Sequence, residues 1–123
     1  MRIIPDSKYE DKPCSYVAVG CAYEDIIKYC FHAAILGHIK EDGYMTLDEA
    51  NKFIREFLPV RKKVYYKRTE RMSLKDFLKT NEEKCCVCTL GHYIYVDQKN
   101  YWSFFDNEND PVVCVWYLRN KKR

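Results

Sequence analysis

The segment from Cys85 to Leu118 decides the fold, and it reads CCVCTLGHYIYVDQKNYWSFFDNENDPVVCVWYL. It is rich in Val, Tyr, Trp, Phe and Cys, and this composition predicts four strands, at residues 85–90, 92–97, 101–105 and 112–118. Turn signals separate the strands by lengths that suit antiparallel hairpins, at Gly91 and at residues 97–100 and 106–111. We therefore expect an antiparallel sheet in the C-terminal part of the chain.

The N-terminal part of the chain has the periodicity of helices. From Cys14 onward, apolar residues recur every three or four positions, as one face of a helix requires. The pattern is interrupted once and resumes until about Gly37, which predicts one broken helix or two consecutive helices. A further helix is predicted over residues 47–57, where Thr46 begins a capping box and Pro59 ends the apolar stripe.

Three shorter segments complete the expected layout. Residues 1–13 carry Pro5 and Pro13 and show no periodicity, so we expect an extended lead-in to the first helix. Residues 60–67 predict a strand, and residues 73–78 predict a short helix. Helices that precede an antiparallel sheet are typical of an α+β protein, with N-terminal helices packed on a C-terminal sheet.

Size and composition limit the classes of protein to consider. The 123 residues are expected to form one domain, residues 1–123, because a chain of this length buries a single core. Hydrophobic residues make up 47% and charged residues 32%, which is the balance of an ordinary folded protein. The formal net charge is only +3, so the sequence does not predict nucleic-acid binding, which requires a denser basic face.

The sequence also bears on where the protein resides. No apolar run approaches the roughly 20 residues needed to cross a bilayer, and the N-terminus lacks the apolar centre of a signal peptide. The seven cysteines are odd in number, and several alternate with apolar residues, as buried thiols do. We therefore expect a soluble protein of the reducing cytoplasm, with free thiols and no membrane contact.

Cys14 and His92 are the candidate nucleophile and base. Cys14 stands where an extended stretch meets a helix, and the N–H groups of a helix N-terminus lower the pKa of a thiol and can hold an oxyanion. His92 follows Gly91 and opens a strand, from which an imidazole can reach a helix N-terminus and accept the thiol proton. Taken alone, each residue is also compatible with an ordinary core position.

A third group is needed to orient the imidazole. The strand after the His92 hairpin ends in Asp106 and Asn107, and an antiparallel neighbour would bring this end back beside His92. We predict Asp106 as the third member, with Asn107 as the alternative. Asp97 lies at the opposite end of the His92 strand and fits this role less well.

With these residues, the chain resembles the papain-like cysteine peptidase superfamily, in particular its small bacterial and phage-encoded members. In that superfamily a nucleophilic Cys begins a helix, a Gly-His pair opens a strand, and an Asp or Asn follows on the next strand. Cys14, Gly91-His92 and Asp106 match in order and in approximate spacing. The resemblance implies a papain-like fold and a Cys-His-Asp triad. Papain-like enzymes commonly add a Gln a few residues before the nucleophile, where this chain has Asp6, Ser7, Lys8 and Tyr9.

The sequence also contains a group of possible zinc ligands, namely Cys85, Cys86, Cys88 and His92. Structural zinc sites usually combine two separated ligand pairs, whereas these residues crowd one strand and its neighbour. Alternation along the strand places Cys86 and Cys88 on the same face, as core residues would be. We therefore expect no metal and no cofactor.

Two functions remain. The first is a thiol-dependent hydrolase or transferase acting on an amide, isopeptide or thioester carbonyl of a protein or peptide, in which Cys14 attacks, His92 moves the proton and Asp106 holds His92. The second is a catalytically inactive domain of the same fold that acts as a binding or inhibitor protein, for example a viral protein directed against its host. The eleven tyrosines favour such a recognition surface.

Overall fold

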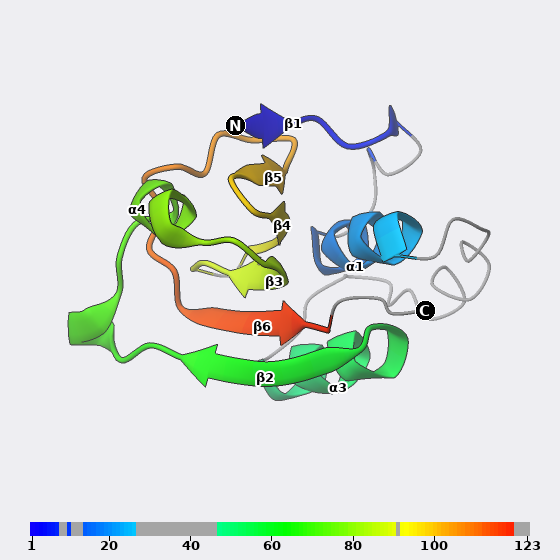
Figure 1. Ribbon diagram of the computed structural model, residues 1–123, viewed down its shortest axis with the longest axis horizontal. Helices are drawn as coiled ribbons and strands as arrows, with labels where there is room; N and C mark the ends of the chain where they lie inside the picture. Colours follow the sequence, from blue (N-terminus) through cyan, green and yellow to red (C-terminus); the bar gives the residue numbers. More distant parts are fainter. Residues whose placement is uncertain (8–9, 11–13, 27–46, 91, 120–123) are drawn as a thin grey trace.

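The chain forms an α+β structure, as predicted, and its strands make one six-stranded sheet. The computed structural model describes residues 1–7, 10, 14–26, 47–90 and 92–119. The strand order across the sheet is β1-β5-β4-β3-β6-β2, which Figure 1 shows from top to bottom. Strands β3 (Lys84–Cys88) and β4 (Tyr93–Asp97) occupy the centre and are buried over most of their length. Because both faces of these strands are covered, their sequences read as nearly continuous apolar runs.

Helices enclose the sheet on both faces. On one face, α1 (Cys14–Ile26) and α3 (Leu47–Phe57) share a core cluster with residues of β4 and of β6 (Cys114–Leu118). On the other face, α4 (Leu74–Thr80) contributes to a second cluster. The three helices lie where the sequence predicts them. The described residues do not include the rest of the predicted helical region, residues 27–37, or the predicted cap Thr46.

Alternation along β3 distributes its cysteines between the two cores. Cys86 and Cys88 face α1 and α3, whereas Cys85 and Val87 belong to the cluster around α4. The prediction that Cys86 and Cys88 share a face as core residues is therefore confirmed. The six described cysteines are free thiols.

Two details of the predicted C-terminal sheet are wrong. Strand β5 (Asn100–Trp102) is shorter than the predicted strand 101–105, and β6 does not form a hairpin with it. Instead, residues 103–113 carry the chain past β4 to the far side of β3, where β6 pairs antiparallel with Cys88 opposite Cys114. The polar loop 106–111 has turn-forming residues, but it is a crossing connection and not a hairpin turn.

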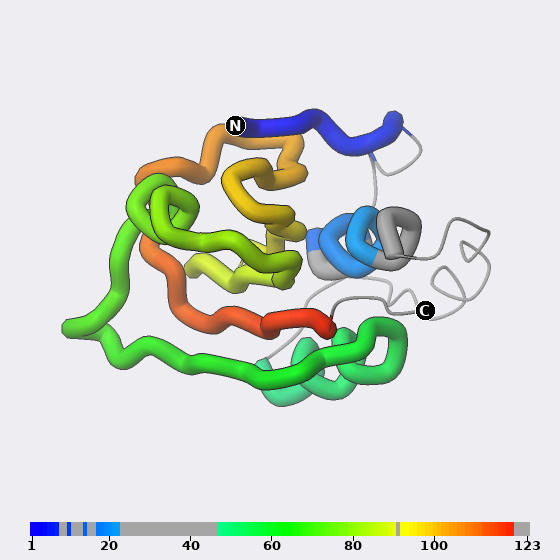
Figure 2. The backbone as a smooth tube through the Cα atoms, viewed as in Figure 1, coloured from blue at the N-terminus to red at the C-terminus, as the bar shows by residue number. Residues whose placement is uncertain are grey.

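The N-terminus contains a strand that the sequence did not predict. Strand β1 (Arg2–Ile3) pairs in parallel with β5, so the sheet is not purely antiparallel. Figure 2 shows this N-terminal segment beside the chain around β5, although the two are far apart in the sequence. The backbone N–H of Ser103 donates to the carbonyl of Ile3 over 3.0 Å, which holds Ser103 at the end of β5.

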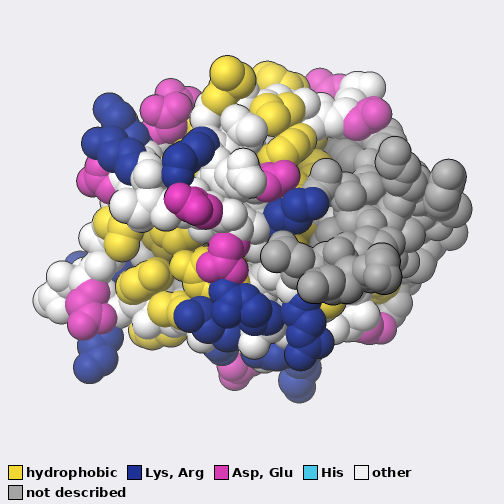
Figure 3. All heavy atoms as spheres, viewed as in Figure 1, with side chains coloured by type: hydrophobic (Ala, Val, Ile, Leu, Met, Phe, Trp, Pro, Cys, Tyr) yellow, Lys and Arg dark blue, Asp and Glu magenta, His cyan; other side chains and the backbone are white. Residues whose placement is uncertain are grey.

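Strand β2 (Val60–Tyr65) forms the outer edge of the sheet next to β6, at the position of a predicted strand. Arg61, Lys62 and Lys63 are exposed on it, and Figure 3 shows Lys and Arg side chains gathered where this strand lies. Charged residues on an edge strand oppose pairing with the edge of another sheet. Within the described ranges, no helix has the length and apolar character needed to cross a bilayer.

Candidate active site

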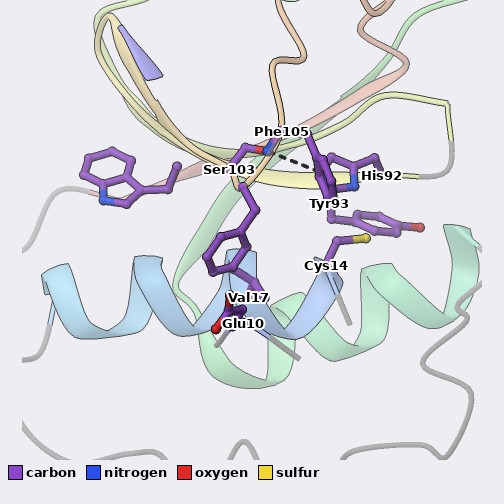
Figure 4. A pocket seen from close by; sticks show the side chains of 9 residues that line it. Glu10, Cys14, Val17, His92, Tyr93, Ser103 and Phe105 are labelled. Carbon is purple, nitrogen blue, oxygen red and sulfur yellow. Dashed lines mark hydrogen bonds between the residues drawn. The ribbon is translucent and has the colours of Figure 1, made fainter. Parts of the chain in front are cut away.

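A cavity of about 370 Å³ lies between the start of α1 and the end of the sheet where β4 begins (Figure 4). Helix α1 contributes Cys14 and Val17, and the start of β4 contributes His92 and Tyr93. The other lining residues are Glu10, before α1, and the run that ends β5 and follows it, Trp102, Ser103, Phe104 and Phe105. The cavity is therefore mainly aromatic, with a thiol, an imidazole, a hydroxyl and a carboxylate on its wall.

Cys14 is the first residue of α1 and is half-buried. The unpaired N–H groups of a helix N-terminus stabilise a thiolate, and the first turn of α1 has no acidic residue to oppose that effect. In Figure 4 the Cys14 sulfur points to the side of the cavity on which the rings of His92 and Tyr93 lie. The thiol is thus placed where a substrate carbonyl could approach it from the cavity.

His92 lies immediately before β4 and is half-buried. The Phe105 ring packs edge-on against the imidazole, with ring centroids 6.1 Å apart. Burial lowers the pKa of His92, and the negative charge of Asp110 opposes that shift. A lowered pKa leaves the imidazole neutral near neutral pH, in the form that can accept a proton.

A chain of hydrogen bonds leads from His92 away from the cavity. His92 Nε2 lies 3.4 Å from Ser103 Oγ, and Ser103 Oγ donates to Asn107 Oδ1 over 2.6 Å. Asn107 Nδ2 in turn donates to Asp110 Oδ2 over 2.8 Å. Ser103 and Asn107 are both buried, so the middle of this hydrogen-bond chain lies in the interior, whereas His92 and Asp110 at its ends are half-buried.

The structure brings Cys14 and His92 to the same cavity, but it does not bring Asp106 to His92. Asp106 is exposed, and its Oδ1 accepts from the hydroxyl of Tyr101 over 3.4 Å and from the backbone N–H of Glu108 over 3.0 Å. Asn107, the predicted alternative, reaches His92 through Ser103. The third candidate, Asp97, lies at the far end of β4, opposite Lys84.

The placement of Asp106 follows from where β5 ends. The β4–β5 ladder pairs Tyr95 with Trp102 and goes no further, because the chain leaves the sheet at Ser103. Ser103 is therefore the residue that comes beside His92, and Asp106 is carried into the connection that follows. The prediction of Asp106 assumed that the strand continued to residue 105.

Sequence reasoning missed two residues of the cavity wall. Ser103 is the one small, non-aromatic residue in the run Tyr101-Trp102-Ser103-Phe104-Phe105, and this contrast was the available signal. Glu10 stands near the position where papain-like enzymes commonly have a Gln, but a carboxylate accepts hydrogen bonds and does not donate them to an oxyanion.

The cysteines of β3 do not resemble a metal centre. Cys86 and Cys88 face one core and Cys85 the other. Among the residues with described positions, no group of three or more His, Cys, Asp or Glu side chains is arranged to hold a metal ion.

No family model, no curated protein and no solved structure matches this chain. The function is therefore inferred from the geometry of the cavity.

Proposed function

We propose that this protein is a thiol-dependent hydrolase or transferase of papain-like type, which acts on an amide, isopeptide or thioester carbonyl. One observation carries the proposal: Cys14, at the first residue of a helix, shares a cavity with His92, which a distant segment of the chain supplies. A helix that begins with the nucleophile and packs on a strand that begins with the base is the arrangement that papain-like enzymes use.

The chemistry assigns one role to each group. The neutral imidazole of His92 accepts the Cys14 proton, and the thiolate attacks the substrate carbonyl to form a tetrahedral oxyanion. Backbone N–H groups at the start of α1 stabilise that oxyanion. Collapse of the intermediate leaves a thioester on Cys14 and transfers the proton from His92 to the departing amine or thiol. Water or an acceptor amine then releases the acyl group.

The lining of the cavity favours a substrate with an apolar or aromatic group beside the scissile bond. Trp102, Phe104 and Phe105 line the cavity that Cys14 enters, and aromatic walls bury a large apolar area of a ligand. This lining would suit a peptide or an acyl chain that enters the cavity with its carbonyl toward α1.

Alkylation of the native protein with iodoacetamide tests the proposal. Cys21 is a matched control, because it is on the same helix and also half-buried, but it is nearly two turns from the helix start. We expect Cys14 to react about tenfold faster than Cys21 near neutral pH, because the helix N-terminus and His92 favour the thiolate form of Cys14. His92→Gln should remove most of that difference.

The outcome also separates the two candidate functions. If Cys14 and Cys21 react at equal rates, and if His92→Gln changes neither rate, Cys14 is not activated and the proposal is wrong. The cavity would then belong to a catalytically inactive binding domain. Mapping of the modified peptides by mass spectrometry identifies which thiol has reacted.

A further inference from the structure

The hydrogen bonds around Ser103 have only one consistent direction. A hydroxyl has a single proton, and Ser103 gives that proton to Asn107 Oδ1 over 2.6 Å. The other two groups at Ser103 Oγ must therefore donate to it. The backbone N–H of Phe105 does so over 3.1 Å, and His92 Nε2 lies 3.4 Å away. A bond between His92 and Ser103 thus requires a proton on Nε2.

Asp110 determines the donor and the acceptor in each of these hydrogen bonds. Its carboxylate can only accept, so the amide of Asn107 turns its Nδ2 toward Asp110, at 2.8 Å. That orientation leaves Asn107 Oδ1 facing Ser103, where it receives the hydroxyl proton. Ser103 and Asn107 are both buried, so bulk water does not compete for these hydrogen bonds.

We propose that Ser103, oriented by Asn107 and Asp110, is the positioning residue of His92 and holds the neutral imidazole in the tautomer with its proton on Nε2. Nδ1 is then the ring nitrogen with a lone pair, and it is the atom that accepts a proton. The assignment of that proton to the Cys14 thiol rests on the function proposed above, but the tautomer does not.

Electrostatics supports the role of Asp110. The negative charge of Asp110 opposes the effect of burial on the pKa of His92. Among the described residues, the other titratable groups that line the cavity with the imidazole are Glu10, Cys14 and Tyr93. Two polarised groups connect Asp110 to the ring, so an imidazolium formed during catalysis would be stabilised through Ser103 and Asn107.

The tautomer can be measured without any catalytic assay. In ¹⁵N-labelled protein with Cys14→Ser, which prevents coupled titration with the thiol, the ring nitrogens of His92 are observed by NMR above the pKa of the imidazole. We expect Nε2 to be protonated and Nδ1 to be unprotonated. The spectrum of His92→Gln identifies the signals among the three histidines of the chain.

Variants separate positioning from a merely structural role. Ser103→Ala should give a mixture of the two tautomers, and Ser103→Thr, which keeps the hydroxyl, should restore the single form. A predominant Nδ1–H tautomer in the Cys14→Ser protein would overturn the proposal, as would a single Nε2–H form that persists in Ser103→Ala.

A pair of neighbouring acids provides a second test that does not depend on Ser103→Ala folding. Asp110→Asn removes the charge that opposes burial and should lower the pKa of His92 further, whereas Asp106→Asn in the same loop should leave it unchanged. Equal effects of the two substitutions would contradict the proposal. If the tautomer and these shifts hold but Cys14 is not reactive, only the proposed function fails.

Discussion

Asn51 is the link between α3 and the most deeply buried tryptophan. Its Oδ1 accepts from Trp116 Nε1 over 2.9 Å, and Trp116 is fully buried, whereas a second bond, from Arg55 Nε over 2.9 Å, lies at the surface. Asn51→Ala leaves the indole N–H without this acceptor. We expect the free energy of unfolding to fall by about 1 to 3 kcal/mol, the usual effect of an unsatisfied buried donor.

Urea unfolding measures this effect against two matched variants. Arg55→Ala removes only the exposed partner of Asn51 and should change the free energy of unfolding by less than about 0.5 kcal/mol. Asn51→Asp keeps an acceptor for Trp116 and should recover part of the loss. If Asn51→Ala lowered the free energy of unfolding no more than Arg55→Ala does, the hydrogen bond to Trp116 would contribute little to stability.

Individual site residues were predictable to the extent that local sequence determined their position. Cys14 and His92 could be proposed because the residues around them set a helix start and a strand start. Ser103 could not be proposed, because its role depends on where β5 leaves the sheet and on a loop that returns Asn107 and Asp110 beneath it. The side-chain partners of a loop are set by long-range packing, which residue spacing does not reveal.

At the scale of elements, α4 depends on a single polar cap. Ser73 Oγ accepts from the backbone N–H of Asp76 over 3.1 Å, and the helix that follows buries Leu74, Phe77 and Leu78. We expect Ser73→Ala to lower the free energy of unfolding by about 0.5 to 2 kcal/mol. Ser73→Asp retains a capping oxygen, so its free energy of unfolding, measured by the same denaturant titration, should fall much less.

A loss of the same size in both variants would mean that the backbone around Ser73, and not its hydroxyl, stabilises α4. The substitution Lys75→Ala, at the exposed second residue of the same helix, is a suitable baseline because alanine has a high helix propensity.

Elements with their own periodicity were predicted well, and those defined by their partners were not. Helices α1 and α3 follow from apolar residues at helical spacing, and α4 from its cap. Strand β1 has only two residues and exists because β5 offers it an edge. The pairing of β6 with β3 was missed because a polar connection of suitable length looks the same in a hairpin and in a crossing.

The buried thiols make the stability of the whole molecule depend on alkaline pH. Burial raises the pKa of Cys85 and Cys86 in the folded state, whereas an exposed thiol of the unfolded chain has a pKa of about 8.5. Above that pH the unfolded chain loses protons that the folded chain retains, so the free energy of unfolding falls as pH rises. For each such thiol the slope rises toward about 1.4 kcal/mol per pH unit as the thiol of the unfolded chain becomes fully ionised.

Urea unfolding under reductant, between about pH 7.5 and pH 9, tests this dependence where most tyrosines of the unfolded chain, with a pKa of about 10, still keep their protons. Cys86→Ala should be less stable throughout this pH range because it leaves a cavity. Its free energy of unfolding should fall less steeply with pH, because one buried thiol has been removed. An unchanged slope in Cys86→Ala would show that Cys86 does not contribute to the alkaline loss.

The two tryptophans of the chain have contrasting surroundings. Trp116 is enclosed in the core and bonded to Asn51, whereas Trp102 is half-buried, lines the cavity and lies 4.8 Å from the Tyr95 ring between centroids. Indole fluorescence responds to the immediate environment of the ring. The emission of Trp116 therefore reports unfolding of the core, and the emission of Trp102 reports whether the cavity is occupied. In Trp116→Phe protein, the remaining indole fluorescence comes from Trp102 in the cavity wall. A library of small molecules could then be screened against the cavity optically, with no dye and before any substrate is identified.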